Sequence, residues 1–203
     1  MRKDLDPALR SARALAPGIR DLLAQVNWRP ADVELVAVAI GPGSFTGLRL
    51  GVMTAKAFAY AVGAKIVGVD TLATIAAQAP PDALRVATVV DAQRGDVYCA
   101  KFTRDQPAGP LTRTTPIAIA AADAWLAELD TGTTIIGPAL AKFAPQNPAL
   151  STLAPREAWF PDAATVGRLA AQRAATGEVD DAWQLAPLYL RRSAAEEKRD
   201  AQL

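Results

Sequence analysis

Apolar residues first recur at helical spacing along this chain and then gather into continuous runs. Over 6–26 they return every three or four residues, which predicts a helix. The run 33–40 is apolar throughout and predicts a strand covered on both faces. A second helix is predicted over 46–62, ending at Gly63, and a strand over 65–69. A strand, a helix and a strand in this order predict a parallel strand pair.

The second part of the chain shows a different pattern, which begins after Ala-Pro-Pro-Asp at 79–82. The segments 85–91 and 96–102 flank Ala-Gln-Arg-Gly and predict a hairpin with a four-residue loop. We therefore predict two tandem α/β subdomains, residues 1–80 and 81–203. The remaining predicted elements are helices at 118–129 and 162–176, a strand at 133–136 and a short element at 187–192.

Composition narrows the classes of function. The 203 residues are 51% apolar, which supports a substantial core, and a net charge of +1 gives no general attraction to nucleic acid or anionic membrane. The sequence has no histidine, which excludes Ser-His-Asp and Cys-His catalysis and histidine-ligated zinc. Cys99 is the only cysteine, so no internal disulfide can form. Without a signal peptide or a long apolar run, we expect a cytoplasmic protein.

A glycine-rich turn, Gly41-Pro-Gly-Ser-Phe-Thr-Gly47, joins the first predicted strand to the second helix. Backbone N–H groups at such a turn can bind an anion, which makes a phosphate or nucleotide contact one interpretation. The other is a tight turn capped by Ser44 or Thr46. No Gly-Lys-Ser/Thr closes the turn, so it is not a Walker A loop. The candidate anion contacts are Gly41, Gly43, Ser44, Thr46 and Gly47.

Three further features each allow a structural and a functional interpretation. The helix over 46–62 is apolar on nearly every side, which favours either burial within the chain or a subunit interface shared with the helix over 6–26. Asp91 follows a strand and either caps a turn or holds Mg²⁺. Cys99 alternates within a strand and is typical of a small core residue, since no histidine can activate it.

Five ordered segments carry a resemblance: GPGSFTGLRLG at 41–51, Thr54-Ala-Lys56, VGVDTL at 67–72, VDAQRGDVY at 90–98 and PLYLRR at 187–192. Together they resemble the TsaB (YeaZ) family, the dimerisation subunit for synthesis of tRNA threonylcarbamoyladenosine. The resemblance implies an actin-like, Hsp70-like nucleotidyl-domain (ASKHA) fold of two α/β subdomains. Proteins of this family open with a strand hairpin that carries Asp-Thr-Ser, and this sequence lacks it. We therefore expect a first subdomain that is truncated at its N-terminus. Either the true start of the protein lies upstream of Met1, or the protein is a naturally shortened form.

The resemblance implies a non-catalytic scaffold that pairs with TsaD, or with itself when TsaD is absent. TsaE and a TsaC-type enzyme would be indirect partners, and tRNA would be met only through the complex. No cofactor or metal is expected, and the sequence offers no peptidase machinery. The alternatives are a small ATP- and Mg²⁺-dependent phosphotransferase that uses the glycine-rich turn, and an inactive fragment. Periodicity gives as candidate interface residues Leu15, Ile19 and Leu22 on the first helix, with Val52, Met53 and Phe58 on the second.

Overall fold

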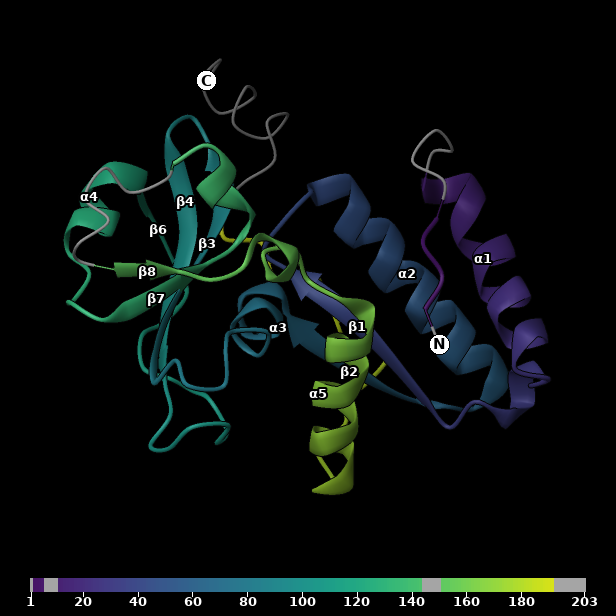
Figure 1. The fold of residues 1–203 in the computed structure, drawn as a ribbon. Coiled ribbons are helices and arrows are strands. Elements are labelled where there is room, and N and C mark those ends of the chain that lie inside the picture. Colours follow the sequence, from purple (N-terminus) through teal and green to yellow (C-terminus); the bar gives the residue numbers. More distant parts are fainter. Residues whose placement is uncertain (1, 6–10, 144–150, 192–203) are drawn as a thin grey trace, which may run out of the picture. The chain divides into compact units, whose positions relative to one another are not determined.

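The computed structural model of the chain describes residues 2–5, 11–143 and 151–191 (Figure 1). Two compact units emerge from its contacts: unit 1 comprises Met1–Asp70 and Ala163–Leu188, and unit 2 comprises Thr71–Asp162 and Tyr189–Leu203. The sequence placed a single division after residue 80. The structure differs because the segment after Asp70 packs in unit 2, whereas the helix after Asp162 returns to unit 1.

Unit 1 is built on a pair of parallel strands, β1 (Leu35–Gly41) and β2 (Lys65–Asp70), which confirms the predicted parallel pairing. The connection between them is α2 (Phe45–Val62), which ends at Gly63 with φ 73°, the left-handed conformation expected of a C-terminal glycine. The first strand starts two residues later than predicted, and the second helix agrees within one residue.

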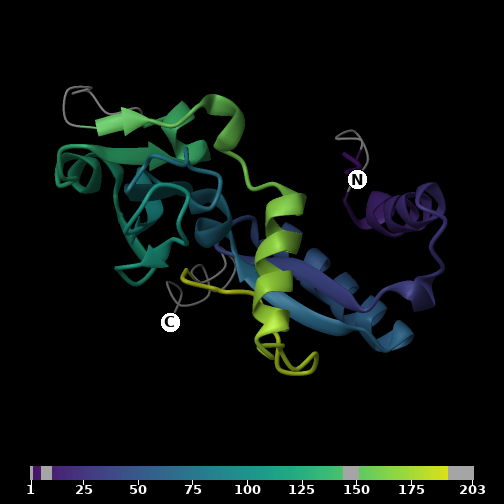
Figure 2. The ribbon, with the colours of Figure 1, turned by 60° about the horizontal axis from the view of Figure 1, so that its bottom comes forward.

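Helices cover both faces of this strand pair. Val36, Val38 and Ile40 pack toward buried residues of α2. The alternate residues Leu35, Ala37 and Ala39 pack toward α5 (Ala163–Ala175). Figure 2 shows α5 crossing the sheet on the face opposite α2. The apolar run of β1 is therefore explained by helices on both faces, as in other parallel sheets.

The two edges of the strand pair differ. Among the described residues only β2 pairs with β1, and the opposite edge of β1 has no neighbouring strand. Each side chain from Leu35 to Ile40 is half-buried in spite of the covered faces. The edge of β2 is occupied by the chain after α5, since the N–H of Asp180 donates to the carbonyl of Ile66 at 2.9 Å.

The predicted first helix forms as α1 (Ser11–Gln25), which includes Pro17 and packs beside α2; residues 6–10 lie outside the described part. Lys3 Nζ lies 2.8 Å from Asp21 Oδ2 and ties residues 2–5 to this helix. A Cβ on Gly18 would lie 2.5 Å from Leu5, so glycine lets the leading segment approach the helix closely. The 3₁₀ helix η1 (Pro30–Asp32) then leads into β1.

Unit 2 contains a six-stranded sheet with the order β5-β4-β3-β7-β8, in which β6 also pairs with β4. The predicted hairpin is confirmed, but its loop is shorter because Gln93 pairs with Asp96 and only two residues intervene. The two intervening residues, Arg94 and Gly95, have φ of 58° and 88°, as a tight two-residue turn requires. The strands are β3 (Arg85–Gln93), β4 (Asp96–Thr103), β5 (Thr112–Arg113), β6 (Ala118–Ala121), β7 (Thr133–Ile136) and β8 (Ser151–Leu153).

One predicted helix of unit 2 was partly wrong. The segment 118–129 begins as β6, because Ala118–Ala121 pairs with β4, and becomes helical only in α4 (Ala122–Ala127). The predicted strand at 133–136 and the helix at 162–176 are confirmed, whereas 187–191 forms no regular element. The other helices are α3 (Thr71–Ala76), η2 (Pro138–Ala141) and η3 (Arg156–Ala158).

The core of unit 2 lies on both faces of its sheet. Val86 and Val90 of β3 pack with Leu72 of α3 on one face. Val89 of the same strand and Ala122 of α4 belong to the cluster on the other face. None of the described helices combines the length and apolarity that a bilayer-spanning segment needs.

Candidate functional site

The glycine-rich turn is closed by contacts within the chain. The hydroxyl oxygen of Ser44 accepts a hydrogen bond from the N–H of Gly47 at 3.4 Å, which caps α2 as the sequence predicted. Gly41 has a φ of 114°, and a Cβ there would lie 3.1 Å from the carbonyl oxygen of Leu188. The N–H of Leu188 donates to Ile40 at 2.7 Å. The close approach that Gly41 permits is therefore to the chain's own residue 188.

The remaining residues of the turn are accessible. Gly43, Ser44, Thr46 and Gly47 are exposed, and Gly43 has only Leu48 within 4 Å of its potential Cβ. One of the free N–H groups at the start of α2 is already taken by Ser44. These contacts explain the turn as a cap and a packing device, and anion binding there stays a prediction.

Asp91 behaves as a residue that stabilises the hairpin turn. Its Oδ1 accepts from the N–H of Gln93 at 2.8 Å, and its Oδ2 lies 3.4 Å from Lys142 Nζ. Both carboxylate oxygens are thus engaged. Within 2–5, 11–143 and 151–191, no group of three or more Cys, Asp or Glu residues comes together to hold a metal ion.

Cys99 is a core residue of unit 2. Only 1% of it is exposed, and burial raises the pKa of its thiol to about 11. Since the thiolate is the nucleophilic form, a thiol with this pKa is inert at neutral pH. The interpretation of Cys99 as a small core residue is confirmed.

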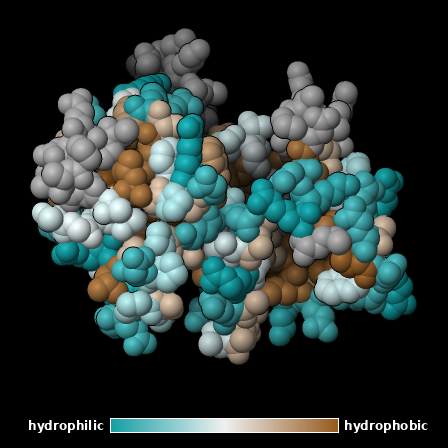
Figure 3. Space-filling model, in the orientation of Figure 1, coloured by the Kyte–Doolittle hydropathy of each residue, from teal (hydrophilic) through white to brown (hydrophobic). Residues whose placement is uncertain are grey.

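The predicted interface helices enclose an apolar groove. The groove has a volume of about 550 Å³ and lies between α1 and α2, both within unit 1. In Figure 3 hydrophobic surface is grouped at the lower right, where Figure 1 has these helices. Ile19 of α1 and Phe58 of α2, two of the candidate contacts, both line it. The lining residues are Ala16, Ile19, Arg20, Leu23, Ala24 and Trp28 with Pro30, Thr54, Ala57 and Phe58.

The other candidate contacts lie elsewhere. Leu15 and Leu22 are half-buried on α1, outside the lining of the groove. Met53 is 62% exposed on another side of α2. Val52 is only 1% exposed, because it packs against the strand pair with Ile66. A partner cannot reach Val52 directly, and we correct its assignment from interface to core.

Sequence reasoning missed an exposed cluster that includes Trp183. Tyr60 of α2 and Trp183 are 72% and 74% exposed, and their rings meet edge to face with centroids 5.4 Å apart. Lys56 Nζ donates to the carbonyls of Trp183 at 3.2 Å and Leu185 at 2.9 Å. Tyr60 and Trp183 are far apart in sequence, so no local pattern could have indicated this contact.

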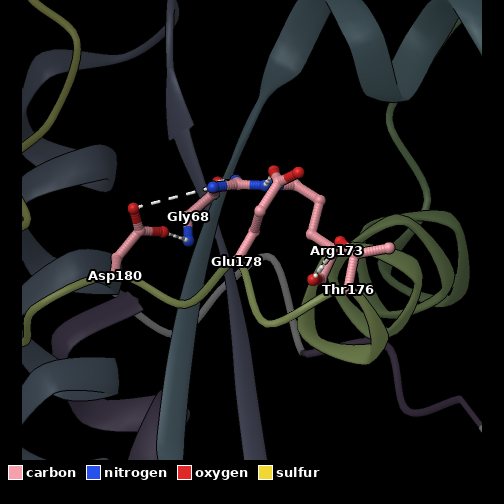
Figure 4. A network of polar contacts seen from close by, with 5 residues as sticks. All are labelled: Gly68, Arg173, Thr176, Glu178 and Asp180. Atoms are coloured by element: carbon pink, nitrogen blue, oxygen red, sulfur yellow. Dashed lines mark hydrogen bonds and ion pairs between the residues drawn. The ribbon is translucent and has the colours of Figure 1, made fainter.

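A polar network fixes the segment that carries Trp183 (Figure 4). Asp180 Oδ2 accepts from the N–H of Gly68 at 2.8 Å, and Arg173 Nη1 donates to the carbonyl of Gly68 at 2.7 Å. The Arg173 guanidinium also lies 3.7 Å from Asp180 and 3.4 Å from Glu178. Both backbone groups of Gly68 are therefore satisfied by side chains, and the edge of β2 is closed at this position.

Comparison with known proteins identifies the family to which this chain belongs. A family model described as tRNA N6-adenosine threonylcarbamoyltransferase, TsaD, matches residues 8–109, about half of the chain. The chain belongs to the TsaD family. Within it, the predicted resemblance to TsaB is confirmed by the TsaB of Escherichia coli, 36% identical over 105 residues, and that of Bacillus subtilis, 37% identical over 92. These alignments span 45% and 40% of the two TsaB proteins.

Longer alignments come from a mycobacterial relative and from solved structures. An uncharacterized protein of Mycobacterium tuberculosis is 37% identical over 182 residues, 89% of this chain and 75% of the relative. YeaZ from Pseudomonas aeruginosa matches with a TM-score of 0.76 and 26% identity over 90% of this chain and 86% of that one. A crystal structure described as similar to peptidase YeaZ matches at 29% identity and a TM-score of 0.74, over 91% and 86% of the two chains. The predicted ASKHA-type α/β fold is confirmed.

Proposed function

We propose that this TsaD-family chain is a non-catalytic scaffold and activator for threonylcarbamoylation of the tRNA adenosine next to the anticodon. Its direct partner would be a TsaD-type transferase, bound through α1 and α2. TsaE and a TsaC-type enzyme would act in the same process without direct contact. In the absence of the transferase, a second copy of the chain would occupy the same helices.

The observation that carries this proposal is the apolar groove between α1 and α2. A groove of about 550 Å³ lined by Ile19 and Phe58 is larger than a side-chain gap and is typical of a surface that a partner covers. The curated relatives named for tRNA threonylcarbamoyladenosine biosynthesis supply the process. The family resemblance implies that TsaD holds its metal through histidines. This sequence has no histidine, so it cannot form that site.

Co-purification tests the proposed pairing. The tagged chain is expressed with the TsaD-type transferase of the same organism, and Phe58→Asp is expected to abolish capture because it places a charge in the groove. Phe160→Asp is a matched control, since Phe160 is 63% exposed in unit 2 and lies outside the groove. Unchanged capture by a folded Phe58→Asp variant would contradict the pairing.

Calorimetry separates the scaffold from the phosphotransferase alternative. The scaffold proposal expects little or no heat when Mg-ATP is titrated into the isolated chain. A stoichiometric binding isotherm that Ser44→Ala weakens would instead support nucleotide binding at the glycine-rich turn.

A further inference from the structure

The last described residues of the chain are bonded at both ends to segments far away in sequence. Residues 187–191 form no regular element, and we name them the closing segment. They belong to one of the five segments that carry the family resemblance, and two of the others begin at Gly41 and at Val90. The closing segment is bonded directly before the first of these and within the second, which gives it a role that the proposed function does not use.

At its first end the closing segment lies along the end of β1. The N–H of Leu188 donates to the carbonyl of Ile40 at 2.7 Å. A Cβ on Gly41 would lie 3.1 Å from the carbonyl oxygen of Leu188, and the φ of Gly41 is 114°, in the region that favours glycine. All three residues belong to unit 1. The backbone of Leu188 is therefore packed where β1 leads into the glycine-rich turn.

At its other end the closing segment holds the β3–β4 hairpin of unit 2. Arg191 Nη1 donates to the carbonyl of Ala92 at 2.6 Å, and Arg191 Nη2 donates to Asp96 Oδ2 at 2.5 Å. One guanidinium thus bonds to both strands, on either side of the turn at Arg94 and Gly95. The side chains of Arg191 and Asp96 are 24% and 29% exposed, so water and salt weaken this ion pair less than a pair on the surface.

Only Tyr189 and Leu190 separate the two bonded residues, Leu188 and Arg191. The division between the units falls in this short stretch, since unit 1 ends at Leu188 and unit 2 resumes at Tyr189. While one end of so short a segment is bonded, the other end is kept at a high effective concentration near its own acceptors. Once one end is lost, the other has to be ordered alone and pays more conformational entropy. The two ends are therefore expected to bond and release together.

We propose that the closing segment is a conformational link, which docks and releases as one piece and couples the order of the glycine-rich turn to that of the β3–β4 hairpin. In the docked state the bonds to Ile40, Ala92 and Asp96 are made, and in the released state all three are lost. A ligand that binds only the ordered form of the turn or of the hairpin would stabilise the docked state and so order the other. Arg191 is the positioning residue of this link. The coupling is a property of the chain itself and does not depend on the proposed function.

Hydrogen exchange at single amides, followed by NMR on the purified full chain, tests the link from the hairpin. Arg191→Ala is expected to speed exchange at the Leu188 amide about tenfold, although the Arg191 side chain bonds only to residues of unit 2. Asp96→Asn keeps the shape of the side chain and removes its charge, so an increase of about threefold is expected at the same amide. If Arg191→Ala does not fold, Asp96→Asn decides the test.

The same link is tested in the opposite direction from the glycine-rich turn. Gly41→Ala places a Cβ against the carbonyl oxygen of Leu188 and strains the backbone. It is expected to speed exchange about fivefold at the amides of Gln93 and Ala122, which are hydrogen-bonded at the hairpin turn. Coupling between two sites is reciprocal, so the link requires an effect in both directions.

Matched controls separate the link from the substitution itself. Arg85→Ala also removes a guanidinium that donates to a backbone carbonyl of unit 2, that of Thr131 at 2.6 Å, and is expected to leave exchange at Leu188 unchanged. Gly63→Ala alters a glycine of unit 1 with φ 73° and no atom within 4 Å of the added Cβ, and is expected to leave exchange at Gln93 unchanged.

Each rate is compared with the free energy of unfolding of the same variant in urea, so that a general loss of stability is not counted as coupling. Faster exchange that stays confined to the hairpin in Arg191→Ala and Asp96→Asn, with the Leu188 amide as in the wild type, would overturn the link. An increase at Leu188 no larger than the loss of global stability explains would overturn it as well. So would a folded Gly41→Ala variant with wild-type exchange at Gln93 and Ala122.

Discussion

Replacing Val52 by Ala tests whether this residue belongs to the core rather than to an interface. The substitution removes two buried carbon groups, which costs about 1.6 kcal/mol at about 0.8 kcal/mol per group. A residual cavity of about 50 Å³ adds about 1.2 kcal/mol at about 24 cal/mol per Å³. Because Val52 is 1% exposed and packs against Ile66, we expect a loss of about 3 kcal/mol in unfolding free energy.

The assay compares Val52 with its exposed neighbour Met53. Val52→Ala is expected to lower the Tm followed by circular dichroism by about 6–12 °C, at about 2–4 °C per kcal/mol. Met53→Ala is expected to change stability by less than about 0.5 kcal/mol, since Met53 is 62% exposed. Binding to the transferase, measured well below the Tm, is expected to be unchanged in Val52→Ala and at least about fivefold weaker in Met53→Ala.

The opposite pattern would refute this reasoning. A Val52→Ala variant with the Tm of the wild type and weakened binding would show that Val52 lies on the interface. The sheet-facing orientation of α2 would then be wrong, and with it the assignment of Val52 to the core and of Met53 to the exposed surface.

Three other predictions concern stability and reactivity. Gly137→Ala is expected to lower the free energy of unfolding in urea by at least about 3 kcal/mol, because φ is 140° and a Cβ would lie within 3 Å of three backbone atoms of Val89. Gly95 has a φ of 88° but open space around it, so Gly95→Ala is expected to lower the same free energy by only about 1–2 kcal/mol. Asp180→Ala is expected to speed hydrogen exchange at the Gly68 amide and to lower the free energy of unfolding by about 1–3 kcal/mol. Unchanged exchange would show that the Asp180 carboxylate does not protect this amide. Cys99 is expected not to react with Ellman's reagent at pH 8 until the chain unfolds. The pKa of its thiol is about 11 in the folded chain against an ordinary 9.0. The contribution of this thiol to the free energy of unfolding is therefore complete below pH 9 and falls as the pH rises from 9 toward 11.

Local signals predicted the elements that position the candidate site. The apolar run of β1, the glycine turn with its Ser44 cap and the left-handed Gly63 all follow from residues close in sequence. The parallel pairing follows from the connecting helix. These features depend on backbone conformation and on short-range hydrogen bonds, which a single sequence encodes directly.

The orientation of α2 could not be predicted in the same way. The helix is apolar on nearly every side, so periodicity alone does not distinguish Val52 from Met53. The contact of Tyr60 with Trp183 depends on a segment returned to unit 1 by α5. The Ala118–Ala121 segment is short and alanine-rich, so its local pattern predicts a helix, whereas its pairing with β4 makes it a strand.

The unequal edges of the strand pair in unit 1 limit how its sheet can grow. The edge of β2 is closed by Asp180 and Arg173 at Gly68, whereas β1 has no strand beside it among the described residues. Any strand added to this sheet must therefore join at β1. If two copies met through that edge, the joined sheet would carry at each end a strand whose Gly68 N–H and carbonyl are already bonded, so this sheet could not extend further.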